Sequence, residues 1–261
     1  MEDLMGQNVS ILIFMAVGFF AQIIDGALGM AYGVSSNSVL LALGVPPKIA
    51  SACVHMAEVV TTAISGFSHF KVGNVDKNLA LRLIVPGVLG GVLGAYLLTQ
   101  LDGDKIKPYI CIYLLIMGLV ILYRAFRAWR EREINKNLIP PLAIVGGFMD
   151  AIGGGGWGPV VTTTLVASGK QPRFAIGSVN MSEFFVTFSE SITFFFTIGA
   201  LFTGYWRIIL GLLLGGAIAA PLAAYVCKFI PRKTLMILVG LVIIFLQVRT
   251  LLSIWWGIKI F

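Results

Sequence analysis

Two glutamates, Glu58 and Glu183, lie inside long apolar stretches of the sequence. A carboxylate at the centre of a bilayer costs roughly 2.5–3.5 kcal/mol on insertion scales, and such residues commonly serve ion or substrate pathways. Each glutamate belongs to a stripe of polar residues whose spacing puts them on one face of a helix. The two stripes are His55, Glu58, Thr62 and Ser65, and Asn180, Glu183, Thr187 and Glu190.

These stripes predict two kinds of chemistry. Glu58 and Glu183 could take up a proton, while His55 and Asn180 could contact a polar substrate. The alternative is structural: the carboxyl groups would bond hydroxyls or backbone donors between helices, and His55 would be a core histidine. We expect Glu190 to lie close to the outer boundary of the membrane.

Glycine-rich segments at residues 25–33 and 150–159 interrupt two of the apolar stretches. Each glycine in a helix interior costs about 1 kcal/mol relative to alanine, so the four glycines at 153–156 predict a break. A helix that restarts after a break carries about half a positive charge and free N–H groups at its N-terminus, which suit an anion. The predicted anion-binding residues are Gly29, Tyr32, Gly33, His55, Gly154, Gly155, Gly156, Trp157, Gly158 and Asn180.

Asp25 and Asp150 immediately precede the breaks. An anion would be repelled by them, so we expect both to hold the loops through backbone hydrogen bonds. Close packing of helices through small residues is the alternative explanation of the glycines.

The composition places these residues in a membrane protein. Of 261 residues, 58% are apolar and 12% are charged, whereas a soluble domain carries roughly 25% charged residues. The net charge of +7 comes from basic residues in short loops, which indicates membrane topology rather than nucleic-acid binding. Nothing resembles a nucleotide loop, a zinc motif or a nucleophile elbow. We therefore expect no enzyme activity, no catalytic residue, no metal and no cofactor.

Apolar runs lie near residues 10–44, 49–69, 79–99, 108–129, 138–168, 172–201, 205–227 and 231–257. About 20 residues of helix cross a bilayer, so most runs fit a single crossing. The first and fifth are longer and contain the glycine breaks, which predicts re-entrant hairpins at about 10–44 and 138–168. This arrangement concentrates basic residues on one side, as the positive-inside rule requires. It predicts that the loop at 130–137 is cytoplasmic and that both termini are periplasmic.

The sequence also repeats itself. At an offset of 125, residues 25–62 align without a gap to residues 150–187 and share twelve identities, including Asp25 with Asp150 and Glu58 with Glu183. Each half has three crossings plus a hairpin, so the halves would insert in opposite orientations. The predicted fold is an all-α polytopic membrane protein of two inverted repeats, 1–130 and 138–261, joined by a basic linker at 131–137. Secondary transporters use this architecture, with the site near the midplane.

The segments 26–33, 153–159 and 175–178, together with the repeat, resemble the TauE/SafE sulfite exporter family, also described as toluene-sulfonate uptake permeases. The resemblance covers nearly the whole chain. It implies a transporter in the bacterial inner membrane for sulfur-containing anions such as sulfite, sulfoacetate, thiosulfate or organosulfonates. The first half departs from the glycine pattern, because Leu28 and Met30 stand opposite Gly153 and Gly155.

We therefore expect a secondary transporter with an alternating-access cycle, coupled to protons through Glu58 and Glu183. Export is the expected direction, although the family includes importers, and a homodimer is an expected assembly. One alternative is an anion channel or uniporter with the same fold. Another is a membrane-embedded sulfur-relay component that uses Cys53.

Overall fold

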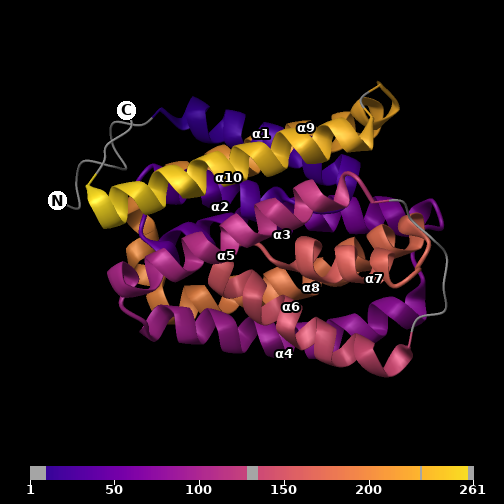
Figure 1. Cartoon of the computed structure of the whole chain (residues 1–261). Coiled ribbons are helices and arrows are strands. Elements are labelled where there is room, and N and C mark those ends of the chain that lie inside the picture. The colour runs from indigo at the N-terminus through magenta and orange to yellow at the C-terminus, as the bar shows by residue number, and fades with distance from the viewer. Residues whose placement is uncertain (1–9, 128–134, 230, 258–261) are drawn as a thin grey trace.

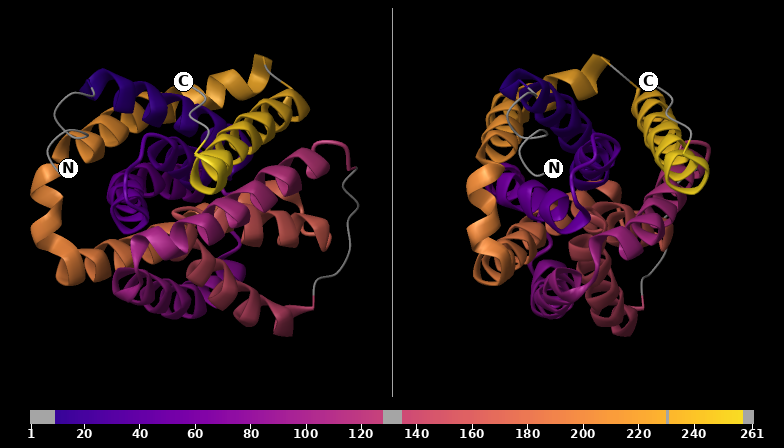
Figure 2. Two further views of the ribbon diagram at one scale, coloured as in Figure 1. Left: turned by 60° about the vertical axis from the view of Figure 1, so that its left-hand side comes forward. Right: turned by 90° about the vertical axis from the view of Figure 1, so that its left-hand side faces the viewer.

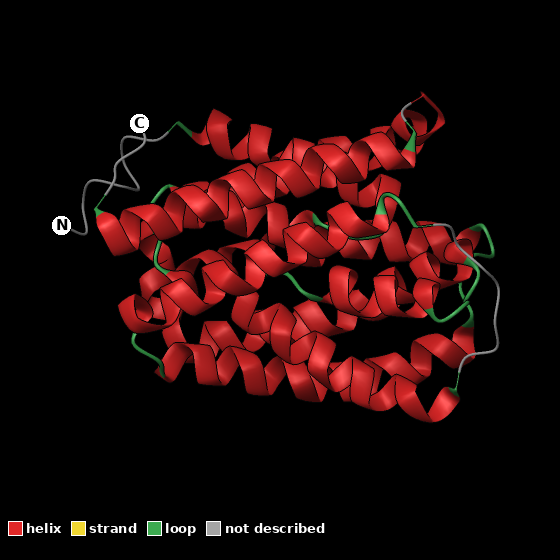
Figure 3. Cartoon of the chain, viewed as in Figure 1, coloured by secondary structure: helices red, strands yellow, loops and turns green. Residues whose placement is uncertain are grey.

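The described part of the chain is helical throughout. The structure is a computed structural model that describes residues 10–127, 135–229 and 231–257, and these ranges contain no strand (Figure 3). The helices are α1 (Ile11–Leu28), α2 (Tyr32–Ala42), α3 (Pro47–Lys71), α4 (Lys77–Gln100), α5 (Gly103–Arg124), η1 (Lys136–Leu138), α6 (Ile139–Gly153), η2 (Trp157–Thr162), α7 (Thr163–Ala167), α8 (Pro172–Ile198), η3 (Gly199–Gly204), α9 (Trp206–Phe229) and α10 (Arg232–Trp256).

Four helices, α3, α4, α5 and α10, are long and apolar enough to cross a membrane, judged by length and composition. Shorter apolar helical stretches lie in α1, in η2 with α7, and in α9. The outer face of α4 exposes Leu81, Val85 and Leu89, a pattern that fits contact with lipid rather than water. The all-helical fold and these apolar helices are consistent with the predicted multi-pass membrane protein.

The helices pack in a consistent set of pairs. Helix α1 lies along α9 at one side of the bundle, and α4 lies along α6 at the opposite side (Figures 1 and 2). Between these pairs, α3 crosses α8, and α5 packs against α10. Small residues make the close approaches: a side chain at Gly90 would overlap the carbonyl of Ile144, and one at Gly215 would overlap that of Met15. This is the small-residue packing common in membrane helix pairs.

Both glycine segments interrupt helices, and they do so in the same way. Helix α1 ends at Leu28 and is capped by Gly29, which is left-handed with φ 66° and donates its N–H to the carbonyl of Asp25. Helix α6 ends at Gly153 and is capped by Gly154, which has φ 65° and donates its N–H to the carbonyl of Asp150. The chain restarts at Tyr32 in α2 and at Trp157 in η2, a wide π-helical turn.

The predicted boundaries of the two halves stay predictions. Residues 128–134, which include most of the predicted linker at 131–137, lie outside the described residues. The predicted hairpin segments, 10–44 and 138–168, contain α1 with α2 and α6 with η2 and α7, respectively.

Candidate functional site

Polar side chains gather in the interior where α3 and α8 cross near the two breaks. The buried carboxyl and imidazole side chains there are His55, Glu58, Asp25, Asp150, Glu183 and Glu190. No Lys or Arg is among the buried residues of the described chain. The described interior therefore contains five carboxyl groups and one imidazole.

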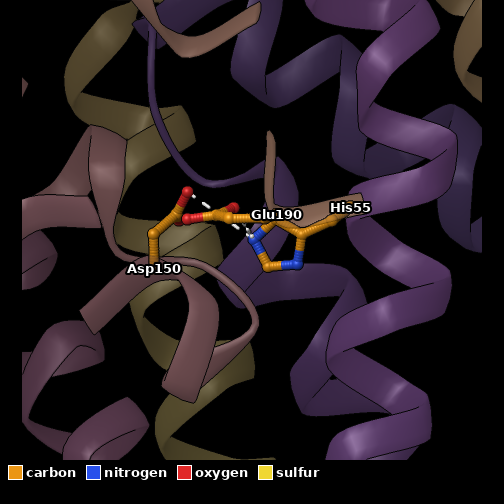
Figure 4. Close-up of side chains that lie close together, drawn as sticks. All are labelled: His55, Asp150 and Glu190. Carbon is orange, nitrogen blue, oxygen red and sulfur yellow. Dashed lines mark ion pairs between the residues drawn. The ribbon is translucent and has the colours of Figure 1, made fainter. Parts of the chain in front are cut away.

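The closest contact in this cluster joins His55 of α3 to Glu190 of α8. Their side chains are fully buried, and His55 Nε2 lies 2.9 Å from Glu190 Oε2. Asp150 of α6 approaches the same nitrogen, with its Oδ2 at 3.6 Å. Figure 4 shows the three side chains converging from three different helices. The other ring nitrogen, His55 Nδ1, lies 2.7 Å from the carbonyl oxygen of Ser51.

Asp150 joins this cluster to the second break. Its Oδ1 accepts hydrogen bonds from the backbone N–H groups of Gly156, at 2.5 Å, and Trp157, at 2.9 Å. Its backbone carbonyl accepts from Gly154 and Gly155. One residue therefore occupies the N–H groups of 154–157, which the sequence had offered as anion donors.

Asp25 has the corresponding place at the first break, with fewer contacts. Its Oδ1 accepts the N–H of Tyr32 at 3.3 Å. The N–H groups of Gly33 and Val34, and of Gly158 in the second break, have no partner among the described residues. These are the donors that the helix N-termini leave unused.

The two breaks contact each other directly. Thr162 donates a hydrogen bond to the carbonyl of Gly29 at 3.1 Å, and Asn37 donates one to the carbonyl of Gly153 at 2.5 Å. A side chain at Gly33 would come within 2.6 Å of Gly155 Cα. Gly155 itself has φ +151°, a conformation that L side chains rarely adopt. The breaks are therefore closed against one another in this conformation.

The large aromatic residues at the breaks are anchored rather than open to solvent. Tyr32 is 1% exposed and donates its hydroxyl to the carbonyl of Leu212 at 3.1 Å. Trp157 is fully buried, and its Nε1 donates to the carbonyl of Val179 at 3.2 Å. Trp157 also fills the space over Gly87, where a side chain would collide with the indole ring.

The remaining predicted residues surround the crossing of α3 and α8. Glu58 is 3% exposed, its Oε2 has no hydrogen-bond partner among the described residues, and it interacts electrostatically with Asp25 and Asp150. Glu183 is 5% exposed and interacts electrostatically with Glu58. Asn180 accepts a hydrogen bond from Ser65 at 2.9 Å.

Glu190 is fully buried and pairs with His55. Its position in the same helical stripe as Asn180 and Glu183 was the available signal for this burial. The expectation that it lies close to the outer boundary of the membrane stays a prediction. Ser51 was not singled out at all; its spacing of four from His55 is the only indication in the sequence that it holds the imidazole.

His55, Asp150 and Glu190 are also residue types that bind metal ions, and their ligand atoms lie within 4.8 Å of one another. The 2.9 Å between His55 Nε2 and Glu190 Oε2 is, however, also the distance of an ion pair between a protonated imidazole and a carboxylate. Such an ion pair accounts for the distance without a metal ion.

Long apolar helices, two helix breaks that meet in the interior and a buried polar cluster are consistent with a multi-pass membrane protein, and the relatives of the chain place it in the transporter class. The chain matches the family described as sulfite exporter TauE/SafE over residues 14–250. It is 44% identical to the Probable membrane transporter protein YtnM of Bacillus subtilis (strain 168) over 252 aligned residues. This alignment covers 94% of this chain and 84% of that protein. The chain therefore belongs to the TauE/SafE family. No solved structure matches it significantly.

Membership in this family confirms the resemblance read from the residues at 26–33, 153–159 and 175–178. It also supports a membrane transporter rather than an enzyme as the broad class.

Proposed function

We infer that this protein is a secondary transporter of small sulfur-containing anions, such as sulfite, sulfoacetate or another organosulfonate, or thiosulfate. The observation that carries this proposal is membership in a sulfite exporter family over nearly the whole chain. The buried polar cluster beside two helix breaks is the kind of interior that secondary transporters place at the midplane.

An arrangement of two inverted repeats fits the helix packing. An offset of 125 relates α1 to α6 and α4 to α9. The contacts obey the same relation, because α1 packs on α9 while α6 packs on α4. The helix before the break in each half, α1 or α6, thus packs against a helix of the other half. This arrangement supports alternating access, in which the two halves move around a site between them.

We place the anion at the breaks, where the free N–H groups of Gly33, Val34 and Gly158 begin α2 and η2. Helix N-termini bind anions through such donors. In the closed conformation Gly155 lies against Val34 and leaves no room there. Entry of an oxyanion would require the two breaks to separate, which would link anion binding to the transport cycle.

The interior carboxyl groups support coupling to protons. Burying an unpaired charge costs several kcal/mol, and five carboxyl groups share one imidazole in the described interior. Protons are the smallest cations that could neutralise them. Glu58 and Glu183, predicted from the sequence, remain candidates to carry the coupling proton.

Orientation and assembly complete the proposal. The beginning of α1 and the end of α10 lie at one end of the bundle (Figure 1). We propose that this end is periplasmic and that the loop at 130–137 is cytoplasmic, in the bacterial inner membrane. Export is the proposed direction, and a homodimer is the proposed assembly.

Transport of labelled sulfite into proteoliposomes, with and without an imposed pH gradient, tests the proposal. Unlabelled taurine, sulfoacetate, thiosulfate and sulfate serve as competitors. We expect uptake against a concentration gradient when a pH gradient is present, with a clear ranking among the competitors. Empty liposomes give the background rate.

Each other outcome selects an alternative. Passive equilibration that ignores the pH gradient would indicate a channel or uniporter. No flux of any anion, from protein shown to be folded, would contradict the substrate class.

A further inference from the structure

The contacts between α3 and α8 form two pairs at equivalent places in the repeat. Thr62 and Thr187, which are 125 residues apart, meet with their hydroxyl oxygens at 3.5 Å. On one side of this contact His55 pairs with Glu190. On the other side Asn180 pairs with Ser65 at 2.9 Å. Asn180 is the counterpart of His55 and Ser65 is the counterpart of Glu190, so one pair is ionisable and its equivalent is neutral.

The hydrogen bonds of His55 determine where its hydrogens lie. Its Nδ1 is 2.7 Å from the carbonyl of Ser51, and a carbonyl can only accept, so Nδ1 carries a hydrogen. If Nε2 carried none, its lone pair would lie 2.9 Å from the carboxylate oxygen of Glu190, with no hydrogen bond to offset the repulsion. An ion pair between a doubly protonated imidazole and the Glu190 carboxylate removes this repulsion. This ion pair contains one proton beyond those of a neutral imidazole and a carboxylate.

We propose that His55 and Glu190 form a proton-binding site that holds one exchangeable proton between α3 and α8, and that this is the proton coupled to anion transport. The coupling half of this statement rests on the proposed function; the existence of the site does not. In the conformation described, the proton lies on Nε2, because Glu190 and Asp150 both place an oxygen near that nitrogen.

Loss of this proton would change the packing of the helices. The proton would leave Nε2 for water, and the imidazole lone pair would remain facing the Glu190 carboxylate. The contact between α3 and α8 would then become repulsive, which favours separation of the two helices. A ligand that binds two conformations differently shifts the equilibrium between them, so occupancy by the proton would stabilise the closed conformation.

The site is physically connected to the breaks through Asp150. One oxygen of Asp150 faces His55, while the other holds the N–H groups of Gly156 and Trp157. The remaining side of the site is shaped by α4, where a side chain at Gly91 would overlap the Glu190 carboxyl group. Proton occupancy and the geometry of the second break can therefore influence each other.

Other titratable groups surround the pair and belong to the same electrostatic cluster. Asp150 of α6 acts on both members directly. Glu58 of α3 interacts with His55 and Glu190, and Glu183 of α8 interacts with Glu190. Asp25 of α1 acts on Glu58 and Glu183, and Tyr113 of α5 interacts with Asp150. Neither oxygen of Glu190 accepts a hydrogen bond from a described residue, and its ion pair with His55 is at 2.9 Å.

Nitrogen NMR of the histidines tests the site directly. The chain contains two histidines, so ¹⁵N-histidine labelling of a His69→Gln protein in nanodiscs leaves His55 as the single signal. At neutral pH we expect both ring nitrogens of His55 to carry hydrogen. In Glu190→Gln, Nε2 should lose its hydrogen and Nδ1 should keep it. An Nε2 without hydrogen in the His69→Gln protein, or one unaffected by Glu190→Gln, would overturn the proposal.

Flux measurements test the coupling, with sulfite as the probe and a pH dye inside the proteoliposomes. The double substitution His55→Asn with Glu190→Ser recreates the neutral pair found on the other side of the contact. It should lower the number of protons moved per sulfite about tenfold or more, within the usual range of coupling energies. The matched control is Ser65→Ala, which alters only the neutral pair and should keep the coupling.

The outcomes separate this inference from the proposed function. If neither the wild type nor the variants move any anion, the proposed function fails, while the NMR result on the site stands by itself. If the double variant keeps full proton coupling, the inference is wrong and the coupling proton lies elsewhere, with Glu58 and Glu183 as the next candidates.

Discussion

At the scale of single residues, Asp150 shows how one side chain can serve two structures. Its carboxylate is itself an anion bound at a helix N-terminus, through the N–H groups of Gly156 and Trp157. The same carboxylate lies beside the imidazole of His55. A substrate anion approaching the second break would therefore meet a site that already holds a negative charge, and it would have to use donors that Asp150 leaves free.

Cys53 allows a prediction at this scale. It is a free, fully buried thiol, and serine already stands at the equivalent position 178. A serine hydroxyl in a helix can bond the carbonyl four residues back, so Cys53→Ser should leave sulfite uptake within about twofold of the wild type, the usual range for a tolerated substitution. Uptake into proteoliposomes measures this. Complete loss of activity from folded Cys53→Ser protein would instead favour the sulfur-relay alternative.

At the scale of elements, the breaks work as a pair. Each contains a glycine in the left-handed conformation four residues after an aspartate, namely Gly29 after Asp25 and Gly154 after Asp150. The glycines of each break lie against the backbone of the other break. Their contact replaces helix-to-helix packing by backbone-to-backbone packing, which only glycine permits at this separation. Movement of either break would therefore be transmitted to the other.

Gly33→Ala tests this contact. The new methyl group would lie 2.6 Å from Gly155 Cα and 2.9 Å from the carbonyl oxygen of Gly154, so backbone would have to shift. Overpacking of this kind costs roughly 1–3 kcal/mol, and we expect sulfite uptake to fall about tenfold.

The matched control is Gly103→Ala, whose methyl group would meet only Pro47 at an ordinary 3.7 Å. It should retain full uptake. Equal activity of the two variants would show that the contact between the breaks does not limit transport.

At the scale of the whole molecule, the two halves are also joined near one end of the bundle. Lys170, just after α7, forms an ion pair with Asp76, the residue that caps α4, at 2.6 Å. Ser178 of α8 accepts the N–H of Asp76 at 2.9 Å. The equivalent positions at the opposite end are Val45 and Leu201, which cannot form such a pair, so this connection exists at one end alone.

The pH dependence of this connection can be predicted. Partial burial disfavours the charged carboxylate of Asp76, but the ammonium of Lys170 and the N–H of Leu79 outweigh it and hold the pKa of Asp76 below its ordinary value. Because the pKa is lower in the folded protein, the stabilisation is present above the ordinary aspartate pKa. It is lost as the pH falls through the lowered value.

Thermal unfolding in detergent as a function of pH measures this effect. Asp76→Asn should lower the midpoint temperature at neutral pH, and the difference from the wild type should shrink as the solution becomes acidic. Asp104→Asn is the control, since Asp104 has no ion pair with a lysine or arginine in the described chain. A difference that stays constant with pH would remove the ion pair as its cause.

Locking the same connection tests whether this end opens during transport. The double substitution Asp76→Cys with Lys170→Cys, joined by a reducible bifunctional thiol reagent long enough to span the lost lysine stem, should stop sulfite uptake, and a reductant should restore it. The single substitutions treated with the same reagent are the controls. Undiminished uptake by the locked protein would show that the halves do not separate here.

The sequence by itself determined the class of structure. The 12% of charged residues and the long apolar runs indicate that most of the surface does not face water. The glycine-rich segments at 25–33 and 150–159 contain the helix ends that the structure has. Such features are local, because composition, helix length and the cost of glycine depend on neighbouring residues in the chain. The family resemblance rested on the same local motifs.

Only the tertiary structure decided which polar groups meet. His55 and Glu190 are 135 positions apart and lie on different helices, so no spacing along the sequence could pair them. The sequence also could not show that Asp150 fills the donors of the second break or that the breaks close on each other. These contacts depend on how α3, α6 and α8 cross, and the crossing is set by packing between helices rather than by the residues of any one helix.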